Sequence, residues 1–289
     1  MTDLDADLAQ SQVDSLHPKQ GFSRRGFAMT SLGVGFALAA QPVSAQTVIV
    51  TDAVGLAAGE VKVPVADGAV PAYRAYPAGK KGAPVVLVIH EVFGVHEHIK
   101  DLCRRLAKAG YYAISPDLYA RYGDATKVAD MGALMQLVGK ASDEQVRGDL
   151  DAAVRFAAED GADVKRLAVT GFCWGGRQSW LYTEATPGVK AAAAWYGPLG
   201  GAKTPVANAA AVKGRMIGFY GGQDRGITQE QRDAMTSALQ AAGDRDSKII
   251  VYEDAGHGFN ADYRASYNGA DAKDAWAKML AWFKAHGVA

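Results

Sequence analysis

The chain has 289 residues, of which 49% are hydrophobic and 21% charged, and its 31 basic residues balance its 31 acidic ones. This composition supports a sizeable core and excludes a disordered chain. The zero net charge argues against nucleic-acid binding, which needs a basic surface. The two cysteines and six histidines show no zinc-binding spacing. Only the pair His96 and His98 could hold a metal, and the alternative is two surface imidazoles in a loop, so we predict no metal site.

Residues 1–45 predict an export signal. Arg24 and Arg25 precede a weakly apolar run at 28–40, and a small-x-small motif ends at Ala45. The paired arginines resemble a twin-arginine signal, although a basic patch before a buried helix is an alternative. The apolar run is too short to span a bilayer, so we expect no stable membrane anchor. We predict export by the twin-arginine machinery, cleavage near Gln46, and a periplasmic or secreted mature protein.

Residues 46–289 contain no linker and predict a single domain. It opens with an antiparallel hairpin at 59–79, with Asp67-Gly68 at the turn. Beyond it, apolar runs typical of strands buried on both faces alternate with segments of helical period. This alternation, with short connections, predicts a mostly parallel sheet covered by helices on both faces. The strands are predicted at 83–94, 111–119, 164–172, 189–197, 214–224 and 247–259, and the helices at 98–110, 142–160, 175–185, 228–243 and 271–287.

Two of these helices carry local signals. Ser142 and Gln145 form a capping box at the start of the helix at 142–160. The helix at 98–110 has apolar residues at helical spacing and stops at Gly110. Cys103 lies on this helix beside apolar residues, so we predict that it packs in the core and forms no disulfide with Cys173.

The second cysteine, Cys173, lies in the sequence Gly-Phe-Cys-Trp-Gly between a predicted strand and a predicted helix. This is the G-x-nucleophile-x-G pattern of the nucleophile elbow, with cysteine where serine is commoner. The glycines allow a sharp turn, and the helix N-terminus favours a thiolate. A buried structural cysteine is the alternative, but it does not explain the surrounding glycines. We predict that Cys173 is a nucleophile.

A thiol nucleophile needs a base and an acid that orients it. Only His257 and His286 follow Cys173 in the sequence, and His286 lies near the terminus on the last helix. His257 lies in a loop just past a strand, where the base is expected in this arrangement. Asp224 follows the preceding strand and is the favoured acid. Asp254, three residues before His257, is its rival.

Two backbone N–H groups are expected to bind the oxyanion. One belongs to Trp174, directly after the nucleophile, and the other to Val92, in the loop after the first buried strand. Many esterases carry glycines in that loop, whereas this chain has Glu91. A carboxylate beside a thiolate disfavours one of the two negative charges.

A family resemblance is carried by the segments HEVFGVHEHIKDLCRRLAKAGY, PDLYAR, GDLDAAVRFA, GFCWGG, GGQD and AGHGF. Together they resemble the dienelactone hydrolase family, the carboxymethylenebutenolidases, over residues 60 to 285. The resemblance implies an α/β-hydrolase fold without metal or cofactor, whose thiolate opens a small ester or lactone substrate. It makes Cys173 the nucleophile, His257 the base and Asp224 the acid. Glu91 resembles the glutamate that contacts the resting thiol and helps to activate it.

The substrate-binding residues depart from the family pattern. The family prototype holds a substrate carboxylate with two arginines, one of them four residues after the histidine, where this chain has Ala261. Arg264 lies three residues further on, and Arg147 is a weak candidate for the second arginine. The resemblance therefore implies the reaction type more firmly than the substrate.

Aromatic side chains near predicted strand ends are the remaining candidates for a substrate pocket. Tyr119, Trp195 and Tyr196 could line it together with Trp174, or simply pack in the core. We predict a cysteine-dependent ester or lactone hydrolase. The alternatives are a broad-specificity carboxylesterase or peptidase of the same fold, and a non-catalytic thiol-binding or redox-sensing protein.

Overall fold

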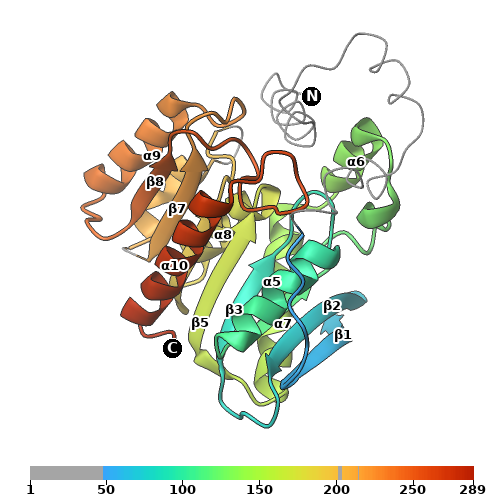
Figure 1. Ribbon diagram of the computed structural model, residues 1–289. Coiled ribbons are helices and arrows are strands. Elements are labelled where there is room, and N and C mark those ends of the chain that lie inside the picture. The colour runs from blue at the N-terminus through green and yellow to red at the C-terminus, as the bar shows by residue number, and fades with distance from the viewer. Residues whose placement is uncertain (1–47, 201–203, 214) are drawn as a thin grey trace.

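The computed structural model describes residues 48–200, 204–213 and 215–289 (Figure 1), so the predicted signal peptide lies outside the described residues. Within them, an eight-stranded sheet has the order β1-β2-β4-β3-β5-β6-β7-β8. β2 runs antiparallel to both of its neighbours, and every pair from β4 to β8 is parallel, as predicted. The strands are β1 (Leu56–Val65), β2 (Gly68–Pro77), β3 (Pro84–Ile89), β4 (Tyr112–Pro116), β5 (Asp163–Phe172), β6 (Val189–Trp195), β7 (Met216–Gly221) and β8 (Lys248–Tyr252).

Helices cover both faces of this sheet. In Figure 1, α5 and α10 lie in front of it, whereas α7 and α8 lie behind it. This is the α/β-hydrolase architecture that the alternation of strands and helices predicted. The helices are α5 (Glu97–Lys108), α6 (Met131–Val138), α7 (Asp143–Glu159), α8 (Trp174–Ala185), α9 (Gln229–Ala241) and α10 (Gly269–Ala285), with short 3-10 helices η1 (Ala125–Lys127) and η2 (Pro205–Ala211). No helix in this part of the chain combines the length and apolarity needed to cross a bilayer.

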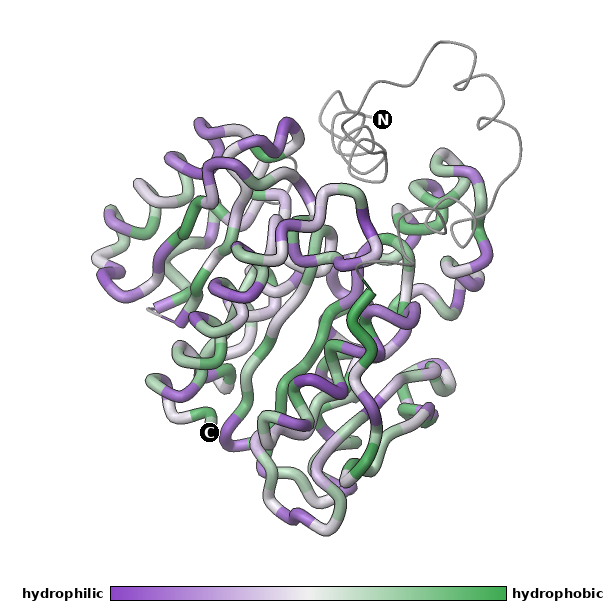
Figure 2. Tube along the Cα trace, in the orientation of Figure 1, coloured by the Kyte–Doolittle hydropathy of each residue, from purple (hydrophilic) through white to green (hydrophobic). Residues whose placement is uncertain are grey.

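The core lies between the sheet and these helices. Every residue of β3 and β4 is buried, and Figure 2 shows apolar residues along β3 in the centre of the sheet. Each fully buried Val, Leu or Ile side chain stabilises the fold by about 1.5–3 kcal/mol relative to an exposed one. Packing on both faces therefore fixes the position of β3. Its carboxyl end gives the loop that follows a fixed starting point.

The local signals are confirmed with some shifts. The first hairpin turns at residues 66–67, one residue earlier than predicted, because Gly68 pairs with Val65 and adopts a φ of 144°. Ser142 caps α7 by accepting a hydrogen bond from the N–H of Gln145 at 3.2 Å. The Gln145 side chain does not complete the capping box, because its amide oxygen accepts the hydroxyl of Tyr122 at 2.9 Å.

The predictions for Cys103 and for the pair His96 and His98 have different outcomes. Cys103 is buried on α5 and both cysteines are free thiols, as predicted. Burial raises the pKa of Cys103 above its usual value, so this thiol is a packing residue. The interpretation of His96 and His98 as surface imidazoles is wrong, since both side chains are buried, at the start of α5.

Candidate active site

The turn between β5 and α8 holds Cys173 in a strained conformation. Its φ of 56° is rare for a residue with a side chain, and such strain is typical of functional sites. A Cβ atom on Gly175 would lie 2.3 Å from the carbonyl oxygen of Ile89, so only glycine fits there. The N-terminus of α8 therefore presses against the end of β3, and Cys173 is held, buried, at the carboxyl edge of the sheet.

A histidine and an aspartate pair beside this thiol. Asp224 follows β7 and His257 follows β8, and Nδ1 of His257 lies 2.7 Å from a carboxylate oxygen of Asp224. Both side chains are buried, whereas Asp254, the rival acid, is exposed. Burial alone would lower the pKa of His257. The charge and hydrogen bond of Asp224, with a hydrogen bond to Cys173, outweigh burial and raise that pKa to about 10. The structure thus brings together the three predicted triad residues.

The loop after β3 is tied to the end of β4 by His90. Its Nδ1 lies 2.7 Å from the carbonyl oxygen of Glu91, and its Nε2 accepts the N–H of Leu118 at 3.1 Å. Burial lowers the pKa of His90 to about 4, so the ring is neutral at pH 7. Among the described residues, the N–H groups of Val92 and Trp174 have no hydrogen-bond partner. Both N–H groups are therefore available as donors, and their role as an oxyanion site stays a prediction.

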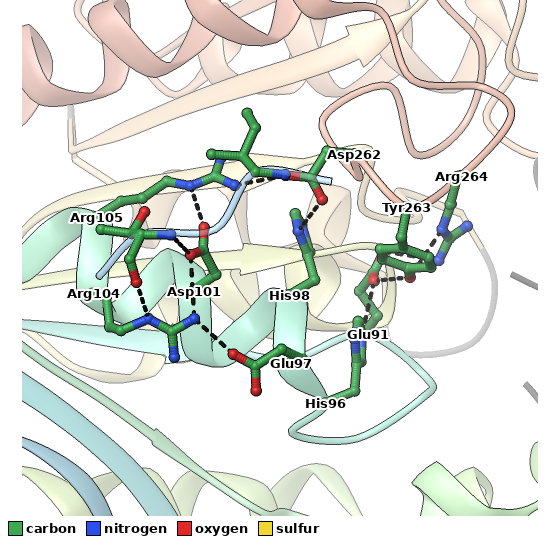
Figure 3. A network of polar contacts seen from close by, with 12 residues as sticks. Glu91, His96, Glu97, His98, Asp101, Arg104, Arg105, Asp262, Tyr263 and Arg264 are labelled. Atoms are coloured by element: carbon green, nitrogen blue, oxygen red, sulfur yellow. Dashed lines mark hydrogen bonds and ion pairs between the residues drawn. The ribbon is translucent and has the colours of Figure 1, made fainter. Parts of the chain in front are cut away.

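Glu91 is held by three side chains in the buried cluster of Figure 3. Tyr263 donates its hydroxyl to one carboxylate oxygen at 2.5 Å, and Nε2 of His96 lies 3.3 Å from the same oxygen. Arg264 donates to the other oxygen at 2.8 Å. Burial opposes the charge of Glu91, but Arg264 and His96 together hold its pKa below the usual range. In this conformation the hydrogen bonds of the Glu91 carboxylate go to these partners rather than to the resting thiol, which differs from the expected contact.

Arg264 is fully buried rather than free to meet a substrate carboxylate. Burial alone would lower the pKa of Arg264. The charge of Glu91, with smaller contributions from Tyr263 and Cys173, outweighs burial and raises this pKa above its usual value. The positive charge of Arg264 is thus paired with Glu91 inside the site. Arg147, the other arginine candidate, is exposed on α7 and lines a separate cavity of about 440 Å³ with Glu184.

The three predicted aromatic residues differ in their surroundings. Tyr119 and Tyr196 are buried, and their hydroxyls have no hydrogen-bond partner among the described residues. Tyr196 has a strained φ of 39°, and its ring meets His257 edge-on at 5.2 Å. Burial raises the pKa of both phenols well above 10, so they remain neutral donors. Trp195 packs in the core instead, 4.7 Å from the Phe219 ring.

Two residues of the Glu91 cluster were missed by sequence reasoning. His96 was considered only as a metal ligand or a surface imidazole, and Tyr263 not at all. The only sequence signal for Tyr263 is its position beside Arg264. The described part of the chain contains no cluster of three or more His, Cys, Asp or Glu side chains that could hold a metal.

Comparison with known proteins points to one family. The sequence model of the dienelactone hydrolase family matches residues 70–287. A Methylorubrum extorquens protein named "Putative carboxymethylenebutenolidase" is 52% identical over 297 aligned residues, covering both chains fully. An Escherichia coli K12 protein of the same name is 49% identical over 88% of this chain and 96% of its own. A crystal structure of a "Putative Dienelactone Hydrolase" from Klebsiella pneumoniae has a TM-score of 0.77 and 48% identity, covering 79% of this chain and 98% of that one.

Replacing Asp224 with asparagine should lower the pKa of His257, because the substitution removes the charge that outweighs burial. In the wild-type protein, NMR should show the His257 ring titrating near pH 10 rather than 6.5. A raised folded-state pKa stabilises the protein fully below pH 6.5, and this contribution is lost as the pH rises through 10. The difference in unfolding free energy between wild type and Asp224→Asn should therefore shrink over that range. A wild-type titration near pH 6.5 would contradict the pairing.

Proposed function

This chain belongs to the dienelactone hydrolase family, and we propose that it hydrolyses ester or lactone bonds through a Cys173–His257–Asp224 triad. The observation that supports this most strongly is the arrangement at the carboxyl edge of the sheet. A strained, buried Cys173 is hydrogen-bonded to a histidine that a buried carboxylate holds at 2.7 Å. This combination of nucleophile, base and orienting acid is the one that acyl transfer needs.

The proposed reaction passes through a thioester. Because Nδ1 of His257 is bound to Asp224, whose charge raises the pKa of the ring, Nε2 is left to take the thiol proton and hold it as an imidazolium beside the thiolate. The Cys173 sulfur attacks the carbonyl carbon, and the oxygen that becomes negative is stabilised by the N–H groups of Val92 and Trp174. The leaving alkoxide receives the proton from His257, and a water then gives its proton to His257 and hydrolyses the thioester. With a lactone, the leaving alcohol stays attached to the acyl group.

The proposed substrates are small cyclic or activated esters with a weak demand for a free carboxylate. This preference is supported by Arg264, whose charge is already paired with Glu91 at 2.8 Å. It is also supported by Tyr119 and Tyr196, which offer neutral hydroxyls rather than charges. A broad-specificity carboxylesterase is favoured by the same observations and remains the second candidate.

Turnover of a substrate panel tests this proposal directly. Purified protein should hydrolyse small lactones and activated aryl esters faster than peptides. Cys173→Ala should lower kcat by about a thousandfold or more, by the usual size of nucleophile losses. The matched control is Cys103→Ala, which removes the other buried thiol and should retain kcat at a cost of about 1 kcal/mol in stability. Rapid alkylation of Cys173 without turnover of any ester would favour a thiol-binding or redox-sensing protein instead.

A second part of the proposal concerns Glu91, which directly precedes the oxyanion residue Val92. When a substrate releases Glu91 from Arg264, the carboxylate can take the thiol proton and leave the nucleophile charged. The alternative is that His257 alone deprotonates Cys173 and Glu91 only shapes the loop. Disfavouring the thiolate at rest would protect an exported enzyme from oxidation.

The substitution Glu91→Gln separates these roles, because glutamine cannot accept the thiol proton. If Glu91 gates the thiol, kcat should fall by about ten- to a thousandfold, the usual size of a general-base effect. The alkylation rate of resting Cys173 should also change while circular dichroism shows an intact fold. Wild-type hydrolysis and wild-type alkylation would together show that the triad alone suffices.

We also propose that residues 1–45 are a twin-arginine signal and that the mature protein acts in the periplasm or outside the cell. The proposal is supported by contacts that begin just after the predicted cleavage site. The N–H of Ile49 donates to Asp262 at 3.2 Å, and the N–H of Thr51 donates to Asp101 at 2.5 Å. Cleavage near Gln46 would leave both contacts intact.

N-terminal sequencing of the exported protein should therefore find a first residue at or near Gln46. Replacing Arg24 and Arg25 with lysines should retain the protein inside the cell, because twin-arginine recognition reads the arginine pair. Recovery of an exported protein that retains residues 1 to 45 would refute the proposal.

A further inference from the structure

One carboxylate outside the proposed triad is bound from two parts of the chain. Asp262 lies in the loop between β8 and α10 and is buried. One of its oxygens accepts from Nδ1 of His98 at 3.0 Å. The other accepts from Arg105 at 2.6 Å and from the backbone N–H of Ile49 at 3.2 Å. His98 and Arg105 both belong to α5, so these contacts fix the loop to that helix.

The ion-pair network continues to the segment at residues 48–52, which crosses in front of α5 in Figure 1. Arg105 also donates to Asp101 at 2.5 Å, and Asp101 accepts the N–H of Thr51 at 2.5 Å. Arg104 donates to the carbonyl oxygen of Thr51 at 2.7 Å. Figure 3 shows the segment, α5 and the Asp262 loop joined through these charges. Asp262 is therefore the point at which three parts of the chain meet.

Asp262 directly precedes the two residues that hold Glu91. Tyr263 packs edge-on against His96 at 5.0 Å and against His98 at 5.3 Å. His98 thus touches both Asp262 and Tyr263, while His96 touches Glu91. An unbroken series of contacts leads from the Asp262 carboxylate to the Glu91 carboxylate. A displacement of the loop at Asp262 would move the partners of Glu91 directly.

We propose that Asp262 is a positioning residue for the active site, which holds Tyr263 and Arg264 against Glu91. It touches no reacting atom and acts through these two neighbours. Arg264 also interacts electrostatically with Cys173, so its placement sets the positive charge near the thiol. The consequence for turnover rests on the proposed function, whereas the consequence for the reactivity of Cys173 does not.

The test compares Asp262→Asn with Asp149→Asn. Asp149 is an equally buried carboxylate, bound by Arg121 at 2.6 Å and Gln145 at 2.9 Å, on α7. Both substitutions remove a buried ion pair, so both should lower the melting temperature. Only Asp262→Asn should slow the alkylation of Cys173 by iodoacetamide at neutral pH, by about ten- to a hundredfold, because the positive charge of Arg264 shifts away from the thiolate. Its kcat should fall in parallel at a temperature where both variants remain folded.

A pair of substitutions at His98 separates positioning from packing. Asparagine keeps a donor near the place of Nδ1, whereas leucine keeps only volume. His98→Asn should therefore alkylate at nearly the wild-type rate, and His98→Leu should resemble Asp262→Asn. Wild-type alkylation in folded Asp262→Asn, or an equal loss in Asp149→Asn, would overturn the proposal. If the wild-type protein hydrolyses no ester, the proposed function fails, and the alkylation rates still decide the role of Asp262.

Discussion

The arrangement of the site depends on the close approach of α8 to the end of β3. Gly175 lies so near the carbonyl oxygen of Ile89 that no other residue fits. This contact accompanies the positive φ of Cys173 at the start of α8 and fixes the turn on which the thiol lies. The cost of such strain, about 1–3 kcal/mol, is offset by the buried sheet beneath it. The geometry of the elbow therefore depends on the rigid packing of the sheet and α8.

A second constraint is that the buried charges near the thiol are paired. Asp224 holds His257, Arg264 holds Glu91, and Arg105 holds Asp262. Removing one partner of a buried pair typically costs 3–5 kcal/mol, because the other charge is left unpaired. Each pair thereby restricts the conformations of its loop. This explains how loops after β3, β7 and β8, which have no regular structure of their own, can hold side chains to fixed positions.

The sequence predicted the elements that depend on local patterns and missed those that depend on long-range pairing. Apolar runs and the glycines around Cys173 sufficed for the sheet and the elbow. The ion pair between Glu91 and Arg264 joins residues 173 positions apart. The sequence around either residue contains no pattern that predicts the other as its partner. For Trp195 the sequence left pocket lining and core packing open, and the structure places its ring in the core against Phe219.

The pairing of Arg264 also bears on how recognition and activation are connected. A substrate carboxylate that binds Arg264 must displace Glu91, and a displaced Glu91 needs either a new partner or a proton. In the proposed mechanism this proton comes from the Cys173 thiol, so such a substrate would create its own nucleophile on arrival. In the same proposal, a neutral ester would meet the unpaired hydroxyls of Tyr119 and Tyr196 and leave the Glu91–Arg264 pair in place. It must then rely on His257 alone. Under this proposal the two substrate classes would differ in which base they use, and not only in affinity.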